Sequence, residues 1–444
     1  MVTTVSNPIC DYYDRVQSYA EAATRSTADQ ETFCPWQMPE LDDEFTAFFS
    51  ASNVSFASID LGLERETTLL NMSMFERTHT TKTNPSLLMV ARAVEHERRT
   101  GEAVTIVTAS SGNKATALRA AVERAYELDL ATPATLNIVS CVPAAAAPKL
   151  WSSALTTDAH LRHANPLFIL DAPRRDAVKS LVRDAQSRLG YSHEGRRLWY
   201  TLALDNYVVA DQLRAAVEID HFPTDSVRWH AHSVSSAYGL IGHSRGWDRF
   251  QPDHPHPGYY LVQHLDTPDM VLHLLHNSFD HSLVPEYQAS PDGLYRQTES
   301  PHFPAVTQNP EECLETTFYT GAPATQDEMQ TAINKHGGSG IVVSGHECAS
   351  RYGRIREAVS AGDVTLPESP ADLKEWSLVM AATGLIEGAS RGLLEGVDSV
   401  VLHNTGDYRS DHYTPVPDQD LVALPDGDPE AFVNHIVSTF KGLS

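Results

Sequence analysis

Short apolar runs alternate with amphipathic segments through the first half of the chain. Ala103–Ala109 is continuously apolar and rich in β-branched residues, as in a buried parallel strand. Leu136–Val142 repeats this pattern, and Pro166–Leu170 repeats it more weakly. The order predicts an open, mostly parallel α/β sheet covered by helices. Apolar residues at helical spacing predict those helices at Pro85–Arg98, Ala115–Leu128 and Asp176–Leu189.

A second series of alternations begins near Trp199 and predicts another α/β sheet of the same kind. Clusters of proline mark long loops within this half. The expected strands are 258–263, 340–344 and 399–402, and the expected helices are 208–219, 240–247, 326–335, 373–380 and 389–395.

The length of 444 residues exceeds what one hydrophobic core usually holds, which favours two domains. We expect an acidic, mainly helical extension at residues 1–55 and a segment at the domain interface at 56–85. A smaller α/β domain then occupies 86–200, and a larger α/β domain occupies 201–444. The predicted fold class is therefore α/β, with two domains built on open, mostly parallel sheets.

Composition narrows the classes of partner. Acidic residues outnumber basic ones by 58 to 33, and the net charge of -25 disfavours binding to nucleic acid or to anionic lipid. The five cysteines are scattered and never spaced as CxxC, which is typical of free thiols in a reducing compartment. No segment has the roughly 18 apolar residues that a membrane span needs, and no signal peptide is visible. We therefore expect a cytoplasmic protein.

The turn Ser110-Ser111-Gly112-Asn113 directly follows the predicted strand Ala103–Ala109. Parallel α/β sheets bind ligands at the carboxyl ends of their strands, where turns lead into helix N-termini. Small side chains and Gly112 permit close approach of an anion or a planar ligand. On its own, a turn of this kind is more often a simple helix cap.

Lys82 lies in a polar loop just before a predicted helix, 28 residues ahead of Ser110. A lysine in a loop is usually solvated surface. The order Thr68-Leu69-Leu70, Lys82 and Ser110–Asn113, however, resembles the fold-type II enzymes dependent on pyridoxal phosphate (PLP), the tryptophan synthase β superfamily. Threonine synthase, cysteine synthase and the tryptophan synthase β chain belong to this superfamily.

Later motifs resemble the threonine synthase branch of that superfamily. The resemblance spans roughly residues 62–407, and it implies the two-domain fold of these enzymes. The motifs are Thr317–Pro323, Gly337–Ser344, Gly384–Ser390 and Val400–Gly406. Gly384–Ser390 resembles the start of a family helix, with Gly388 where proline is usual, and Val400–Gly406 contains a Thr-Gly turn.

The resemblance implies a role for each motif. Lys82 would carry PLP as a Schiff base and then act as general base for the α-proton of the substrate. Asn113 would hydrogen-bond the ring hydroxyl of the cofactor. Thr405 would face the pyridine nitrogen, where a neutral hydroxyl favours elimination or replacement over transamination. The substrate carboxylate would be held by Ser110, Ser111 and Gly112.

The cofactor phosphate would bind in the segment before the predicted helix 240–247. In the family this loop is rich in glycine, whereas here only Gly239 remains. Serine hydroxyls and a helix N-terminus can also bind phosphate, so we keep this segment as the phosphate loop. Its residues are Ser233, Ser235, Ser236, Ala237, Tyr238 and Gly239.

Histidines are numerous, at 21, and two of them flank the phosphate loop. His232 and His243 are candidates to donate to the phosphate or to protonate a leaving group. The other histidine clusters do not have the spacing of a zinc site, so no metal is predicted.

Together these features predict a PLP-dependent lyase or synthase that performs β- or γ-elimination or replacement on an amino-acid substrate. The threonine synthase-like motifs and the altered loops favour a role in specialised amino-acid metabolism or biosynthesis. Two alternatives stay open: a cysteine synthase-type β-replacement enzyme, and a catalytically inactive binding protein with the same fold. Members of the superfamily commonly dimerise, which makes a homodimer an expectation.

Overall fold

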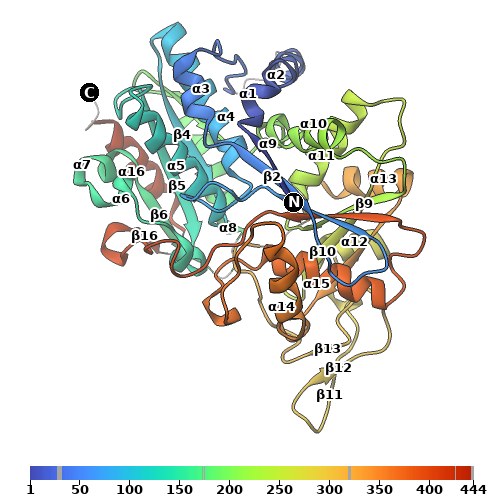
Figure 1. Ribbon diagram of the computed structural model, residues 1–444. Coiled ribbons are helices and arrows are strands. Elements are labelled where there is room, and N and C mark those ends of the chain that lie inside the picture. Colours follow the sequence, from blue (N-terminus) through green and yellow to red (C-terminus); the bar gives the residue numbers. More distant parts are fainter. Residues whose placement is uncertain (28–32, 173, 175, 319–321, 426, 442–444) are drawn as a thin grey trace.

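The computed structural model describes residues 1–27, 33–172, 174, 176–318, 322–425 and 427–441. Two large sheets stand side by side, each packed between helices (Figure 1). A small three-stranded sheet projects from the lower end of the molecule in this view, and it consists of β11 (Gln288–Ala289), β12 (Tyr295–Arg296) and β13 (Val306–Thr307).

The six-stranded sheet has the order β16-β6-β5-β4-β8-β7, and all its neighbours are parallel except β7 and β8. Six of the seven residues of β4 are buried, which explains the unbroken apolar run in its sequence. The strands are β4 (Ala103–Ala109), β5 (Leu136–Pro143), β6 (Leu167–Asp171), β7 (Ser192–His193), β8 (Arg196–Tyr200) and β16 (Val422–Pro425). The helices around them are α4 (Thr83–Thr100), α5 (Asn113–Glu127), α6 (Ala154–Thr157), α7 (Ala159–Ala164), α8 (Ala177–Leu189) and α16 (Pro429–Lys441).

The seven-stranded sheet has the order β1-β2-β3-β15-β9-β10-β14. The run from β3 to β14 is parallel, and β1 and β2 add antiparallel strands at one edge. The strands are β1 (Val2–Ser6), β2 (Asn53–Ser58), β3 (Glu66–Asn71), β9 (Arg228–Ser233), β10 (Gly258–His264), β14 (Gly338–Val343) and β15 (Ser399–Asn404). The helices are α9 (Asp205–Asp211), α10 (Leu213–His221), α11 (Tyr238–Phe250), α12 (Asp269–His276), α13 (Gln326–His336), α14 (Gly345–Ser360) and α15 (Ser377–Ser390).

Both ends of the chain are built into a sheet. Residues 1–55 contain the helices α1 (Pro8–Asp11), α2 (Tyr13–Thr27) and α3 (Asp43–Phe49), and also β1. At the other end, residues 405–421 leave β15 and cross to the six-stranded sheet, where they lead into β16. The crossing segment is anchored on the way, since the amide of Ser152 donates to the carbonyl of Thr414 over 2.8 Å.

Helix α15 differs from expectation. The sequence predicts two helices, 373–380 and 389–395, with a new helix starting near Gly384. The structure shows one continuous helix, Ser377–Ser390, and Gly384 and Gly388 lie inside it. The helix is buried on almost every side, so it has no polar face and no 3.6-residue periodicity to reveal it. Its glycines do not interrupt the helix; Gly384 allows close contact with Val262, and Gly388 allows close contact with Tyr260.

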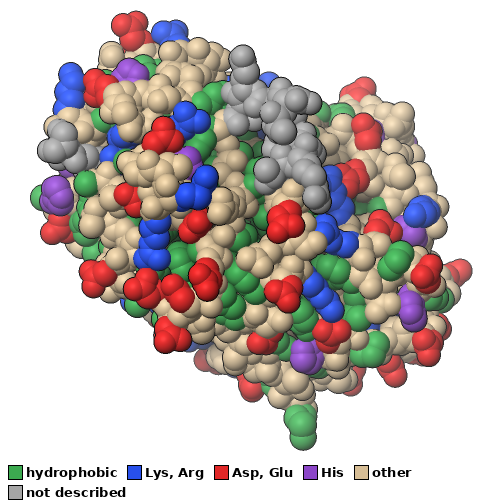
Figure 2. Space-filling model, turned by 90° about the horizontal axis from the view of Figure 1, so that it is seen from above, with side chains coloured by type: hydrophobic (Ala, Val, Ile, Leu, Met, Phe, Trp, Pro, Cys, Tyr) green, Lys and Arg blue, Asp and Glu red, His purple; other side chains and the backbone are tan. Residues whose placement is uncertain are grey.

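The expected helix 208–219 is also divided, into α9 and α10, at Gln212. Among the described residues, no helix has both the length and the apolar character to cross a membrane. Acidic side chains are spread over the face shown in Figure 2 and do not gather in one patch.

Candidate active site

A cavity of about 400 Å³ lies where three strand ends meet. Ser110 follows β4, Ser233 ends β9, and Thr405 follows β15, and all three line the cavity. The carboxyl ends of parallel strands are the usual ligand sites of α/β sheets. Residues from both large sheets therefore form this single site.

The predicted site residues converge on this cavity, with one exception. Gly112 does not line it, and its φ of 136° is a conformation open to glycine alone. A Cβ atom there would also lie 3.2 Å from Thr317, so Gly112 shapes the turn. The residues that line the cavity are Lys82, Ser110, Ser111, Asn113, Ser233, Ser235, Ser236, Ala237, Tyr238, Gly239 and Thr405.

Lys82 stands at the N-terminus of α4, at the end of the polar loop. The loop is fixed by its threonines: Thr83 Oγ1 donates to the carbonyl of Thr80 over 2.9 Å, and the amide of Thr81 donates to the carbonyl of Thr405 over 3.0 Å. Burial lowers the pKa of the Lys82 amine, and the positive charge of Arg214 adds to this, against opposing carboxylates. A lysine with a lowered pKa is more often uncharged, which is the form that attacks an aldehyde.

The Ser110 hydroxyl braces the turn after β4. It accepts hydrogen bonds from the amides of Gly112, at 3.0 Å, and Ala115, at 2.9 Å. These contacts satisfy amides at the start of α5, where no intrahelical partner exists. The oxygen of Ser110 is thus engaged in holding the turn, and among the described residues its own proton has no acceptor.

Asn113 is held in a fixed orientation. Its Nδ2 donates to Glu375 Oε2 over 2.8 Å, and the Tyr408 hydroxyl donates to its Oδ1 over 3.0 Å. Burial, and then the neighbouring carboxylate of Glu315, raise the pKa of Glu375, and Lys149 opposes this from 3.5 Å. An amide nitrogen has two N–H donors, so Asn113 keeps one for a ligand.

The loop from Ser233 to Gly239 turns the chain into α11. Ala237 adopts a left-handed conformation, with φ 50°, and α11 begins at the next residue. Among the described residues, the buried hydroxyl of Ser233 has no hydrogen-bond partner. Gly239 is retained for packing, because a Cβ atom there would lie 2.5 Å from the guanidinium of Arg214.

Arg214 was missed by the sequence interpretation. Its buried guanidinium pairs with Asp211 at 2.8 Å, and its Nη2 donates to Thr81 Oγ1 over 2.9 Å. It therefore connects the loop of Lys82 to the underside of the phosphate loop at Gly239. In sequence, a buried arginine three positions after a buried aspartate resembles ordinary core packing, so no pattern marked it.

A chain of buried histidines continues from Arg214. The guanidinium donates to His403 Nδ1 over 3.0 Å, and His403 Nε2 lies 2.8 Å from His230 Nδ1. His230 Nε2 lies 3.2 Å from Glu218. Because arginine can only donate, His403 Nδ1 is an acceptor and the proton of His403 lies on Nε2. That proton is donated to His230 Nδ1, so His230 carries its own proton on Nε2, toward Glu218, and both rings are neutral. Burial holds the pKa of His403 well below its usual range, in agreement with this assignment.

The two histidines that flank the phosphate loop have different surroundings. His232 lines the cavity, is buried, and has a pKa well below its usual range because of that burial. His243 does not line the cavity. It lies in the core, 2.8 Å from Glu218 and 3.0 Å from the Tyr259 hydroxyl, so its proposed contact with a phosphate is not supported.

A second lysine, Lys114, was also missed. It follows Asn113 directly and lines the same cavity as Lys82. The two amines lie over the same ring, with Lys82 Nζ 5.9 Å and Lys114 Nζ 5.7 Å from the centroid of Tyr207. The position next to the predicted turn was the one signal available. Helix α8 adds Lys179 and Arg183 to the wall, and Asp176 directly before the helix lines it as well.

The predicted Thr317–Pro323 turn is described only in part, since residues 319–321 lie outside the described residues. Thr317, Phe318, Ala322 and Pro323 line the cavity.

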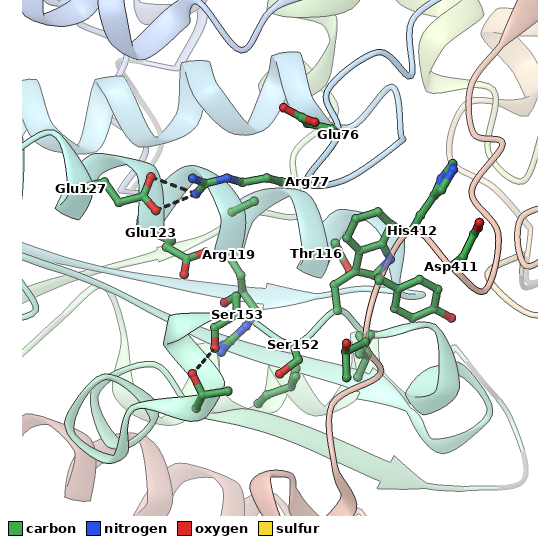
Figure 3. A pocket seen from close by; sticks show the side chains of 17 residues that line it. Glu76, Arg77, Thr116, Arg119, Glu123, Glu127, Ser152, Ser153, Asp411 and His412 are labelled. Carbon is green, nitrogen blue, oxygen red and sulfur yellow. Dashed lines mark hydrogen bonds and ion pairs between the residues drawn. The ribbon is translucent and has the colours of Figure 1, made fainter. Parts of the chain in front are cut away.

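A larger hollow of about 780 Å³ lies along the outer face of α5 (Figure 3). Arg77 bridges to both carboxylate oxygens of Glu127, at 2.7 and 2.9 Å. Trp151 and Tyr413 also line the hollow and stack on each other, with ring centroids 5.0 Å apart. None of the predicted site residues lines this hollow.

The family model for the DUF6002 family, described as a family of unknown function, matches residues 4–437. The chain belongs to the DUF6002 family. No curated protein sequence matches this DUF6002 member significantly.

Solved structures show the fold of the chain. An L-serine ammonia-lyase from the fungus Rhizomucor miehei superposes with a TM-score of 0.50 at 12% identity, covering 81% of this chain and 94% of that one. A PLP-bound threonine synthase from Brucella melitensis gives 0.49 at 13%, covering 96% and 89%. An O-acetylserine-dependent cystathionine β-synthase from Helicobacter pylori gives 0.47 at 13%, covering 85% and 98%. The predicted α/β fold of the fold-type II PLP enzymes is confirmed.

Proposed function

We propose that this protein is a PLP-dependent lyase or synthase that acts on an amino acid by β- or γ-elimination or replacement. The observation that carries the proposal is the position of the Lys82 amine. It lies in a buried polar cavity, with a lowered pKa, among the turn residues that its sequence context predicts.

The residues present fit the cofactor. Ser233 offers a buried hydroxyl without a partner among the described residues, at the turn into a 13-residue helix, and such a turn favours a phosphate. Asn113 keeps an amide donor for a ring oxygen, and Thr405 supplies a neutral hydroxyl from the end of β15. When bound, PLP supplies an electron sink for the bonds at the α-carbon of an amino acid.

The chain's own groups would carry the remaining tasks. Lys82 would hold the cofactor, and its amine in the cavity would be able to take the α-proton of the substrate. Ser111 and the N-terminus of α5 offer donors for the substrate carboxylate. Burial of the cavity wall keeps bulk water from competing for these contacts. The threonine synthase-like branch remains our preferred assignment of substrate type, supported by the Thr317–Pro323 and Val400–Gly406 segments.

The test is to add PLP to the purified chain, reduce with borohydride, and locate the modified lysine by mass spectrometry. We expect a visible absorption band and modification of Lys82. The Lys82→Ala variant should lose both, whereas Lys114→Met and the exposed Lys335→Ala variant should keep both.

Two outcomes would contradict the proposal. A wild-type chain that shows no band at saturating PLP favours the cofactor-free binding protein. Modification of Lys114, with Lys82 unmodified, would show that the cofactor is attached to Lys114 and not to Lys82.

A homodimer is expected by resemblance alone, and light scattering of the purified protein tests it.

A further inference from the structure

The cavity contains a second amine that the proposed function does not use. Lys114 follows the Ser110–Asn113 turn and is the second residue of α5. Among the described residues, the hydrogen-bond partner of its Nζ is the carbonyl of Thr201, at 3.5 Å, which is the outer limit of a hydrogen bond. No carboxylate pairs with it among the salt bridges of the described residues, and its three N–H donors are therefore poorly satisfied.

The two lysines share one surface. Tyr207 is buried, and the amines of both Lys82 and Lys114 lie within 6 Å of its ring centroid. The charged groups that face Lys114 are mostly cationic, which disfavours its charged form. Among the described residues that line the cavity, the charged ones on this side are Lys82 at the start of α4, Lys179 and Arg183 on α8, and Asp176 just before α8; Tyr238 and the neutral His232 also line it.

Burial, and then the charges of Lys179 and Lys82, lower the pKa of Lys114 to about 7. An amine that titrates near neutral pH can both give and take a proton during one turnover. A surface lysine, with a pKa near 10.4, would hold its proton too tightly to do this.

We propose that Lys114 is a second catalytic amine, which donates a proton to the leaving group of the substrate while Lys82 takes the α-proton. This inference rests on the proposed function. The bond between the substrate carbon and the leaving oxygen or nitrogen breaks, and its electron pair stays with that atom. The proton from Lys114 Nζ neutralises this pair, and exchange with water returns one proton to Lys114 and removes one from Lys82.

The assignment explains why two lysines share one cavity at the cost of their mutual repulsion. It also defines the substrate class as amino acids with a leaving group that needs protonation, such as a hydroxyl or an amine. A carboxylate leaving group would gain little from Lys114, because it departs as a stable anion.

The first test measures Lys114 directly and requires no turnover. The full-length protein is labelled briefly with acetic anhydride between pH 6 and 10, and each lysine is quantified by mass spectrometry. We expect Lys114 to react at least roughly tenfold faster than exposed Lys335 at pH 7, since a surface amine is almost fully protonated there. A profile for Lys114 that matches Lys335 would overturn the inference.

The second test compares L-serine with O-acetyl-L-serine, which differ in whether the leaving group needs a proton. Lys114→Met and Lys114→Arg should each slow elimination from L-serine by roughly 10²- to 10⁴-fold and abolish the limb of its pH profile near 7. Elimination from O-acetyl-L-serine should change by less than about threefold, because acetate leaves without a proton. Equal losses on the two substrates would mean that Lys114 only positions the site.

The two proposals fail in distinguishable ways. A wild-type chain without the PLP band contradicts the proposed function itself. A normal band on Lys82, together with a Lys114 that labels like Lys335, contradicts the second amine alone.

Discussion

Arg214 is the residue whose replacement most severely tests the buried architecture behind the cavity. Its guanidinium donates to three acceptors: Asp211 Oδ1, His403 Nδ1 and Thr81 Oγ1. The second oxygen of Asp211 is buried and has no partner among the described residues, so Asp211 depends on Arg214 for compensation. Arg214→Met keeps much of the side-chain volume and removes every donor.

The expected cost follows from this arrangement. Removal of one partner from a buried ion pair costs about 3–5 kcal/mol, because the other charge stays buried and unpaired. With an unfolding entropy of about 2.1 cal/mol/K per residue and a cooperative unit of roughly 250 residues, a loss of ~4 kcal/mol lowers Tm by about 8 °C. Differential scanning calorimetry of the two proteins measures this shift.

A matched control separates burial from charge. Arg296 also pairs with an aspartate, Asp292, at 2.7 Å, but its side chain is 41% exposed. Arg296→Met should leave the midpoint of unfolding almost unchanged, because a pair exposed to solvent contributes little to stability. The double variant Arg214→Met with Asp211→Leu should regain most of the lost stability, since an apolar pair replaces the stranded charge. The reasoning is refuted if Arg214→Met is as stable as Arg296→Met.

Two further predictions concern the core. The pKa of His243 is lowered by burial to about 4, so between pH 6.5 and 4 the unfolded chain binds a proton that the folded chain does not. Stability is therefore lost as the pH falls through this window, by up to about 3 kcal/mol. His243→Gln should flatten the curve of Tm against pH, and a curve unchanged from that of the wild type would contradict the prediction. Gly388→Ala should cost about 1–3 kcal/mol in urea unfolding because its methyl group would collide with the Tyr260 hydroxyl. Gly353→Ala, in the open on α14, should be neutral or stabilising by up to about 1 kcal/mol, and similar behaviour of the two alanines would argue against the collision.

The sequence predicted the elements whose burial is uniform or clearly periodic. Strand β4 matches its predicted bounds, Ala103–Ala109, because a strand buried on both faces is an unbroken apolar run. The sequence pattern predicted two helices in place of the continuous helix α15, because a helix buried on all sides has no polar stripe that would mark its length. Strand β16 was missed because its membership in the six-stranded sheet depends on a partner, β6, about 250 residues earlier in the chain.

The same reasoning separates the predicted from the unpredicted parts of the site. Lys82, Asn113 and Thr405 belong to local motifs, and all three line the cavity. Arg214 contacts His403 across 189 positions of sequence, and Glu375 contacts Asn113 across 262. Such pairs have no local spacing and become visible only when the sheets are assembled.

The crossing segment 405–421 has a mechanical consequence. It carries Thr405 at the cavity on one sheet, is pinned at Thr414, and ends in a strand of the other sheet. Any rotation that widens the cavity must therefore strain this tether or bend it. Access to the cavity and the tension in this segment are thus coupled, and cutting the tether between 409 and 413, before the contact at Thr414, should loosen the two halves without touching a residue that lines the cavity.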